Sequence, residues 1–377
     1  MRIEGEECVK SITVDRSKRL AQEPGKGHNR WHEAITPVIE VEVGEEVEIE
    51  TRDAFDGQIT EATTAEDLRK ADFNLIHALT GPVFVAGAAP GDLLEVEIRD
   101  MKAASFGYTV QVPGFGFLRD AFPEPYIAKW TIKDGFAESA DLPSVRIPDC
   151  SFVGVIGVAP SKELRETIQR REASLLDRGG MVLPPEPRGA VPAGELIASQ
   201  ALRTNPPREN GGNLDIKQLS KGARLLLPVF VDGALFSVGD THFAQGDGEA
   251  CGTAIEMAGA ILVRFALHKG EAERRGIRFP RFARDDYYFP PELAAPRRFL
   301  ATTGMSIRED GTNESEDVTL SARNALLAMI DLLMERGWSR QQAYAICSVA
   351  VDLKLNELVN FPNLVVSAFL PLDIFGL

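Results

Sequence analysis

The 377-residue sequence is poor in cysteine and has no long apolar run. Its four cysteines lie far apart without a CxxC pair, which excludes a cysteine zinc knuckle and argues against a disulfide framework. The opening MRIEGEECVKSITVD lacks the basic segment and apolar stretch of a signal peptide, so we expect a cytoplasmic protein. The apolar run AGAILVRFALHKG is broken by Arg264 and falls short of the roughly 20 residues that a membrane span requires.

Positive charge is also in short supply. The chain holds 41 Lys and Arg against 56 Asp and Glu, which gives a formal net charge of −15. Because no excess of cations is present to neutralise phosphates, we expect no nucleic-acid partner. A hydrophobic content of 44% and a charged content of 26% are typical of a globular protein. The length is sufficient for two or three domains or for one large layered unit.

Alternating apolar and polar residues predict β-strands over much of the chain. VIEVEVGEEVEIET (38–51) and GARLLLPVFVDGALFSVGD (222–240) each place two runs around a turn, so each predicts a hairpin. GDLLEVEIRD (91–100) and AGAILVRFALHKG (258–270) predict further strands. Helices are predicted over three segments, 161–180, 320–337 and 339–353. Ser161 is the expected N-cap of the first, and Ser339 and Gln342 have capping-box spacing at the start of the third.

These elements predict a mainly β fold with a few helices near the C-terminus. We divide the chain into a mainly β N-terminal part (1–150), a β-rich middle part (151–300) and a helix-containing C-terminal part (301–377), packed as one compact unit. Two loops rich in Pro and Gly, at 178–195 and 203–215, interrupt the middle part. Long irregular loops in a compact protein are usually functional or interface elements.

The stretch SVGDTHFAQGDGEACGTAIE (237–256) concentrates reactive groups. Asp240 and His242 are two residues apart at a strand end, so both side chains are expected on one face. This pair suits a divalent metal such as zinc, although a hydrogen bond in a surface turn has the same pattern. Asp247 and Glu249 follow between glycines, and a second carboxylate could take a proton from an attacking water. Cys251 lacks a basic partner at fixed spacing, which favours a small buried residue over a nucleophile.

Two further segments offer carboxylates and imidazoles. TRDAFDGQIT (51–60) places Asp53 and Asp56 at a strand end, either in an ordinary acidic turn or pointing into a cleft. His77 has apolar neighbours, as a core histidine has, but Thr80-Gly81-Pro82 just beyond it is expected to form a turn, as a site loop would. The two histidines of GHNRWH (27–32) are interpreted as capping or packing residues.

Together these segments resemble the acetamidase/formamidase family, and the resemblance runs nearly end to end. The matching strings are GHNRWH, DAFDGQI, HALTGPVFVAGAAPGDLLEVEI, RENGGNLD, LFSVGDTHFAQGDGEACGTAIE and VDLKLNELVNFPNLVVSAFLP. The GD-x-H-x-x-QGDGE segment is specific to that family, and the opening string is closer to its formamidase branch. The resemblance implies a β-sandwich or barrel-like fold, a homo-oligomer, and hydrolysis of a short carboxamide to carboxylate and ammonia. It extends to amidases that open small cyclic amides such as γ-lactams.

Carried over position by position, the resemblance implies a site containing Asp53, His77, Asp240, His242 and Glu249. We expect His77, Asp240 and His242 to bind a divalent metal, with zinc favoured over calcium. Glu249 and Asp53 are the candidate catalytic residues, with Glu249 as the proton acceptor.

Four residues are candidates for contacting the substrate, namely Gln58, Phe243, Gln245 and Gly246. The backbone amides of Gly246 and Gly248 are candidates for holding an oxyanion. The sequence departs from the expected family pattern at Asp56, Ala78 and Phe243. The bulk of Phe243 bears on the size of the substrate more than on the reaction.

A second hypothesis is a non-catalytic protein that binds a metal or a small molecule. Calcium prefers about six to eight oxygen ligands, and five carboxylates could supply several of them, namely Asp53, Asp56, Asp240, Asp247 and Glu249. A calcium site has no use for His242, and this favours the amidase. The sequence contains no Gly-x-Ser-x-Gly elbow and no Ser-x-x-Lys pair, so a serine mechanism has little support.

Overall fold

The computed structural model describes residues 9–286, 290, 296 and 298–375. Strands make up more of this part of the chain than helices, which confirms the predicted mainly β fold. The helices are α1 (Lys162–Asp177), α2 (Glu195–Gln200), α3 (Glu271–Arg275), α5 (Val318–Glu335) and α6 (Arg340–Ala350), with short 3-10 turns at Leu20–Gln22, Glu66–Lys70 and Leu372–Ile374. None of the described helices has the length and apolar character needed to cross a bilayer.

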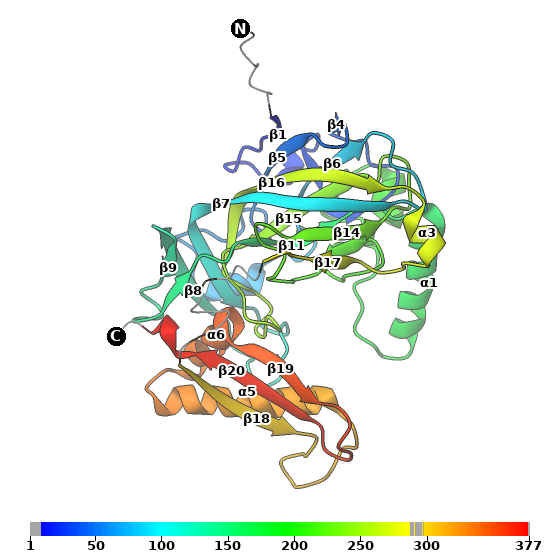
Figure 1. Ribbon diagram of the computed structural model, residues 1–377. Helices are drawn as coiled ribbons and strands as arrows, with labels where there is room; N and C mark the ends of the chain where they lie inside the picture. Colours follow the sequence, from blue (N-terminus) through cyan, green and yellow to red (C-terminus); the bar gives the residue numbers. More distant parts are fainter. Residues whose placement is uncertain (1–8, 287–289, 291–295, 297, 376–377) are drawn as a thin grey trace.

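One large sheet forms the upper body of the molecule (Figure 1). Its longest path runs β10-β9-β8-β7-β16-β15-β11-β13. These strands are β7 (Leu93–Gln111), β8 (Tyr126–Lys133), β9 (Phe136–Glu138), β10 (Arg146–Pro148), β11 (Phe152–Gly157), β13 (Gly211–Asn213), β15 (Phe236–His242) and β16 (Glu256–His268). The pairing of β7 with β16 therefore joins residues from the first and second 150 residues within one sheet.

The other strands of this sheet attach beside that path. They are β1 (Lys10–Ile12), β2 (Gly27–His28), β4 (Ile39–Val41), β5 (Glu46–Thr51), β6 (Leu79–Val85), β14 (Arg224–Pro228) and β17 (Arg281–Ala283). A separate small sheet pairs β3 (Arg30–Trp31) with β12 (Leu202–Arg203). The predicted strand faces are observed, since Ile49, Val96, Ile261 and Val263 all lie in one buried apolar core.

Both predicted hairpins are wrong, although their strands exist. The two runs around Gly44 form β4 and β5, but β4 pairs in parallel with β6 and β5 pairs with β1 and β16. The runs around Asp232-Gly233 form β14 and β15. Strand β14 pairs with β7 and β17, whereas β15 pairs with β6, β11 and β16. Alternation fixes which face of a strand is buried, whereas long-range packing decides which strand becomes its neighbour.

The C-terminal residues form a smaller unit below the large sheet (Figure 1). Its antiparallel sheet has the order β18-β20-β19, from β18 (Phe299–Met305), β19 (Asp352–Glu357) and β20 (Val365–Pro371). Helix α5 lies directly on this sheet, where a Cβ at Gly304 would stand only 2.3 Å from the Ala325 backbone nitrogen. The predicted capping box of Ser339 and Gln342 starts α6, and Ser161 caps α1.

The cysteines that the structure describes form no disulfide bond. Cys150, Cys251 and Cys347 are buried free thiols, and Cys8 lies outside the described residues. Burial raises the pKa of Cys251 to about 11, so its thiol stays protonated at neutral pH. Cys251 is thus a small buried residue, as its surroundings in the sequence favoured.

Candidate active site

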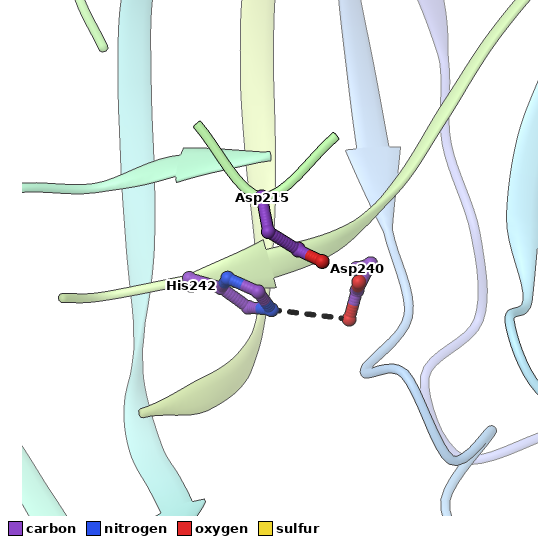
Figure 2. Close-up of side chains that lie close together, drawn as sticks. All are labelled: Asp215, Asp240 and His242. Carbon is purple, nitrogen blue, oxygen red and sulfur yellow. Dashed lines mark ion pairs between the residues drawn. The ribbon is translucent and has the colours of Figure 1, made fainter. Parts of the chain in front are cut away.

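Strand β15 brings Asp240 and His242 together in the interior of the large sheet. The Nε2 atom of His242 lies 3.2 Å from Asp240 Oδ1, and both side chains are buried. The backbone at Asp240 has a φ of 58°, a left-handed conformation that is uncommon outside glycine and often found at functional sites. Asp215, which follows β13, points at the same spot from a neighbouring loop (Figure 2).

A glycine on the adjacent strand makes room for these three side chains. Gly154 of β11 stands opposite Asp240, because Val153 pairs with Thr241 and Val155 with Gly239. A Cβ at Gly154 would lie 2.6 Å from Asp215 Oδ1, 2.6 Å from Asp240 Oδ2 and 2.8 Å from His242 Cε1. The cluster therefore fills a space that any other residue at this position would occupy.

Gln245 fixes the orientation of His242. Its side-chain nitrogen donates to the carbonyl oxygen of Asp215 at 2.9 Å, so its oxygen faces His242 Nδ1 at 3.1 Å. An amide oxygen only accepts, and His242 Nδ1 must therefore carry a hydrogen. The lone pair of the neutral ring is left on Nε2, which points at the carboxylates of the cluster.

Two glutamates complete the buried cluster. Glu256 is the first residue of β16 and the direct cross-strand partner of His242, with Oε2 3.2 Å from His242 Nε2. Glu249 comes from the loop between β15 and β16 and lies within reach of both residues. Burial raises the pKa of Glu256 to about 8, and burial together with Asp215 raises the pKa of Glu249 well above its usual range.

The remaining charges of the cluster oppose one another. Burial and the Asp240 carboxylate raise the pKa of Asp215 to about 7. Burial alone would also raise the pKa of Asp240, but His77 and His242 hold it well below the usual range. For His242, burial favours the neutral ring, yet Glu256 and Asp240 raise its pKa well above the usual value. Burial and the neighbouring charges therefore act together on every group of the cluster.

The donor atoms of this cluster fit a divalent cation. Ligand atoms of Asp215, Asp240 and His242 lie within 4.8 Å of one another, and so do those of His242, Glu249 and Glu256. His242 Nε2, Asp215 Oδ1 and Glu256 Oε2 are buried without a hydrogen-bond partner, even where another polar atom is close. Buried polar atoms are normally paired, so this convergence of unpaired acceptors indicates a place for a cation.

His77 borders the cluster and opens onto a small cavity. Its Nε2 lies 3.7 Å from Asp240 Oδ2, its Nδ1 is buried without a partner, and burial lowers its pKa. The cavity measures about 40 Å³ and is also lined by Asp240, Glu249 and Glu256. Phe55, Phe73 and Phe115 close it with their rings in edge-to-face contact.

The sequence was compared with known proteins and matches the Acetamidase/Formamidase family model over residues 13–377. The chain belongs to the acetamidase/formamidase family. It is 36% identical to a formamidase of Methylophilus methylotrophus, over 97% of this chain and 93% of that protein. It is 38% identical to an acetamidase of Mycolicibacterium smegmatis, over 89% of this chain and 88% of that protein.

A solved structure with the same fold is a gamma lactamase from Delftia acidovorans. The TM-score is 0.92 at 36% identity, over 98% of this chain and 94% of that chain. The similarity to an acetamidase from Bacillus halodurans is weaker, with a TM-score of 0.55 at 27% identity, over 93% of this chain and 98% of that chain. The resemblance carried by the quoted motifs is therefore confirmed.

In this member of the acetamidase/formamidase family, two of the predicted residues lie outside the cavity wall. Asp53 accepts hydrogen bonds from the Tyr108 hydroxyl at 2.6 Å and from the Gly57 amide at 2.8 Å, so it closes its own turn. Gln58 also uses both ends of its amide, bonding to the backbone of Phe55 in that turn and to the backbone of Asp72 outside it. The cavity is lined instead by Ala54 and Phe55 of the same segment.

Other residues predicted to contact the substrate or an oxyanion have their contacts in other parts of the fold. Phe243 alternates away from His242 and is fully buried in the second large core, with α5 and α6. The amide of Gly246 donates to the Ser348 carbonyl at 2.9 Å, so it holds the loop to α6 and is not available for an oxyanion. Gly248 is exposed to solvent.

The calcium hypothesis drew several oxygen ligands from five carboxylates, and these five do not all converge. Asp56 accepts from the Leu20 amide at 2.8 Å, and Asp247 lies 3.8 Å from the buried amine of Lys217. Of the five proposed oxygen donors, only Asp240 and Glu249 belong to the ligand groups found among the described residues.

Asp215 and Glu256 belong to the cluster but were not among the predicted site residues. Glu256 closes the reactive stretch in the sequence, and Asp215 ends the loop 203–215, so both lay within quoted segments. Their roles depend on the pairing of β15 with β16 and on the contact of the loop with Gly154. A prediction of strand register would have been the signal for Glu256.

Proposed function

We propose that the protein hydrolyses the C–N bond of small carboxamides, giving a carboxylate and ammonia or an amine. The observation that carries the proposal is the buried set of unpaired donor atoms of Asp215, His242 and Glu256 beside a small cavity. The formamidase, acetamidase and gamma lactamase to which the chain is similar all have names that denote amide cleavage. Formamide, acetamide and small lactams are the substrates to test first.

We propose that Asp215, Asp240 and His242 hold the divalent metal, with His77 and Glu256 beside it. One nitrogen and several oxygen donors suit zinc, which takes histidine and carboxylate ligands in sites with an open position. A cation held there supplies a Lewis acid that polarises the amide carbonyl and makes a water acidic near neutral pH. Gln245 supports this role, since holding the second ring nitrogen of a ligand histidine fixes its tautomer.

Glu249 is the residue that we propose moves the proton. It lines the cavity, where a substrate would sit, and it belongs to the group of His242 and Glu256. As the carboxylate it accepts a proton from the attacking water, and as the acid it returns that proton to the departing nitrogen. A positioned acid–base group contributes roughly 10²–10⁴-fold to a rate.

The cavity favours a short acyl group. Its volume of about 40 Å³ corresponds to about three water-sized positions. Phe55, Phe73 and Phe115 provide an apolar part of its wall. Amides with a formyl or acetyl group therefore fit this space without rearrangement, and longer chains require the aromatic wall to move.

The experiment is to measure ammonia release from formamide and acetamide, and ring opening of 2-pyrrolidinone, with the metal content quantified. Activity should fall on chelation and return with Zn²⁺. His242→Ala should lower kcat/KM by about 100-fold or more. His268→Ala is the matched control, because that histidine pairs with Glu95 at the surface. Metal that stays bound without hydrolysis of any amide would favour the binding-protein hypothesis instead.

We also propose that the protein acts in the cytoplasm as a homo-oligomer. Three buried unpaired cysteines support a reducing compartment. Phe299 of β18 and Phe361 are 51% and 77% exposed, and such apolar side chains are commonly covered by a second subunit. Light scattering on the purified protein measures the number of subunits directly.

A further inference from the structure

The loop 203–215 places two asparagine side chains in the wall of the cavity. Asn205 and Asn213 both line it, together with His77, Asp240 and Glu249. The Oδ1 atom of each asparagine is buried and has no hydrogen-bond partner among the described residues. A buried acceptor left unpaired costs free energy, and a bound ligand that donates hydrogen bonds recovers it.

The loop that carries these asparagines is firmly held. The buried Arg208 donates to the Arg203 carbonyl at 2.7 Å and pairs with Glu172 of α1 at 2.7 and 3.0 Å. Asn210 donates to the Val158 carbonyl at 2.8 Å. Asn213 itself pairs with Val155, beside Gly154. The backbone that carries both asparagines is therefore held before any ligand arrives, which lowers the entropic cost of binding.

Two unpaired acceptors match the nitrogen of a primary carboxamide. That nitrogen carries two N–H donors, and the two asparagine oxygens offer one acceptor for each. We propose that Asn205 and Asn213 form the subsite for the substrate nitrogen, each side-chain oxygen accepting one N–H. The inference rests on the proposed function and adds the residues that recognise the nitrogen of the leaving group.

The subsite also has a consequence for the proton transfer. As water adds to the carbonyl carbon, the nitrogen becomes pyramidal and its lone pair is no longer shared with the carbonyl. With both N–H bonds held by the asparagines, the lone pair is directed away from them. Glu249 then delivers its proton to that lone pair, the electrons of the C–N bond pass to nitrogen, and ammonia leaves. A correctly held acceptor for the proton is a precondition for general-acid catalysis.

Two substituted amides separate the roles of the asparagines. A primary amide has one N–H syn to the carbonyl oxygen and one anti to it. A five-membered lactam keeps only the syn N–H, because the ring replaces the other. N-methylformamide, in its preferred conformer, keeps only the anti N–H. One asparagine should therefore matter for formamide and the lactam, and the other for formamide and N-methylformamide.

The experiment compares Asn205→Ala and Asn213→Ala with the wild type on formamide, 2-pyrrolidinone and N-methylformamide. The metal content of each variant is measured, and Asn356→Ala, an exposed asparagine on β19, is the matched control. Each site variant should lose about 10-fold or more in kcat/KM for formamide. One variant should spare the lactam and the other should spare N-methylformamide. Where a substituted amide is not turned over, its inhibition constant against formamide is compared in the same way.

The outcomes separate this inference from the proposed function. Equal losses for all three amides in both variants would show a general disturbance of the site and overturn the subsite. Unchanged kinetics in both variants would overturn it as well. Asn205→Ser and Asn213→Ser, which keep a smaller acceptor, replace any alanine variant that fails to fold. If the wild type hydrolyses no amide at all, the proposed function itself fails, and the subsite fails with it.

Discussion

Substitution of Gly154 by alanine tests whether the carboxylate cluster binds a metal. The new Cβ would stand 2.6 Å from both Asp215 Oδ1 and Asp240 Oδ2. Carbon atoms of this kind are not found closer than about 3.0 Å, so each oxygen has to retreat by at least about 0.4 Å. Metal–ligand distances tolerate only about 0.2 Å. The substitution therefore displaces two proposed ligands beyond that tolerance while leaving their chemistry unchanged.

We expect Gly154→Ala to weaken metal binding by about 10–100-fold, or about 1.4–2.7 kcal/mol. Overpacking should also lower the free energy of unfolding of the metal-free protein by about 1–3 kcal/mol. Metal affinity is measured by competition with a chelator, activity by ammonia release, and stability by denaturant unfolding after chelation. The last measurement isolates packing from metal binding.

Gly25→Ala is the matched control, because a Cβ at Gly25 meets no atom within 4 Å. That variant should keep the affinity, the activity and the stability of the wild type. If Gly154→Ala also kept wild-type metal affinity, Asp215 and Asp240 would not both be ligands. The reasoning from the unpaired donor atoms would then be refuted.

Three further results are expected. At pH 7, Zn²⁺ binding to the chelated protein should release protons from Asp215 and His242, since the pKa of Asp215 is about 7 and that of His242 is raised well above its usual value. Release should decline as the pH rises through about 7 to 9, because Asp215 then loses its proton before the metal binds. Calorimetry in buffers of different ionisation enthalpy measures the release, and pH-independent release would contradict the ligand role of Asp215. Gln245→Leu should reduce metal affinity about 10–100-fold by freeing the His242 ring, and unchanged affinity on chelator competition would contradict the tautomer argument. Burial raises the pKa of Asp56 from 3.8 to about 6, so the folded state loses stability as the pH rises through this range. Asp56→Asn, at a φ of 54° that asparagine tolerates, should therefore gain about 2–3 kcal/mol over the wild type at pH 7.5 but little at pH 4 in denaturant unfolding. An equal gain at both pH values would refute the assigned cause.

Local sequence patterns were sufficient to predict the features that depend only on residues close together in the chain. The spacing of Asp240 and His242 predicts that they meet, and they do, at 3.2 Å. Apolar alternation in 258–270 predicts a buried strand face, and Ile261 and Val263 lie in the core. The capping box at Ser339 depends on residues three apart and is likewise present.

Only the tertiary structure decided which distant segments complete the cluster. Glu256 is fourteen residues from His242 along the chain but its direct cross-strand partner, because β15 pairs with β16. Asp215 arrives through a loop held by Arg208, and it fits because position 154 has no side chain. Strand register and close backbone approach arise from the packing of the whole sheet, which no short window of sequence contains.

The difference between local sequence pattern and tertiary packing also explains why some predicted site residues do not face the cavity. Asp53 and Gln58 lie in a family motif, yet Asp53 closes a turn beside the cavity and Gln58 joins that turn to the backbone of Asp72. The sequence by itself determined the family, the strand faces and the reactive stretch, because these follow from residue identity and nearest neighbours. The fold decided the ligand set, the direction of Phe243 and the shape of the cavity, because each depends on which strands become neighbours in space.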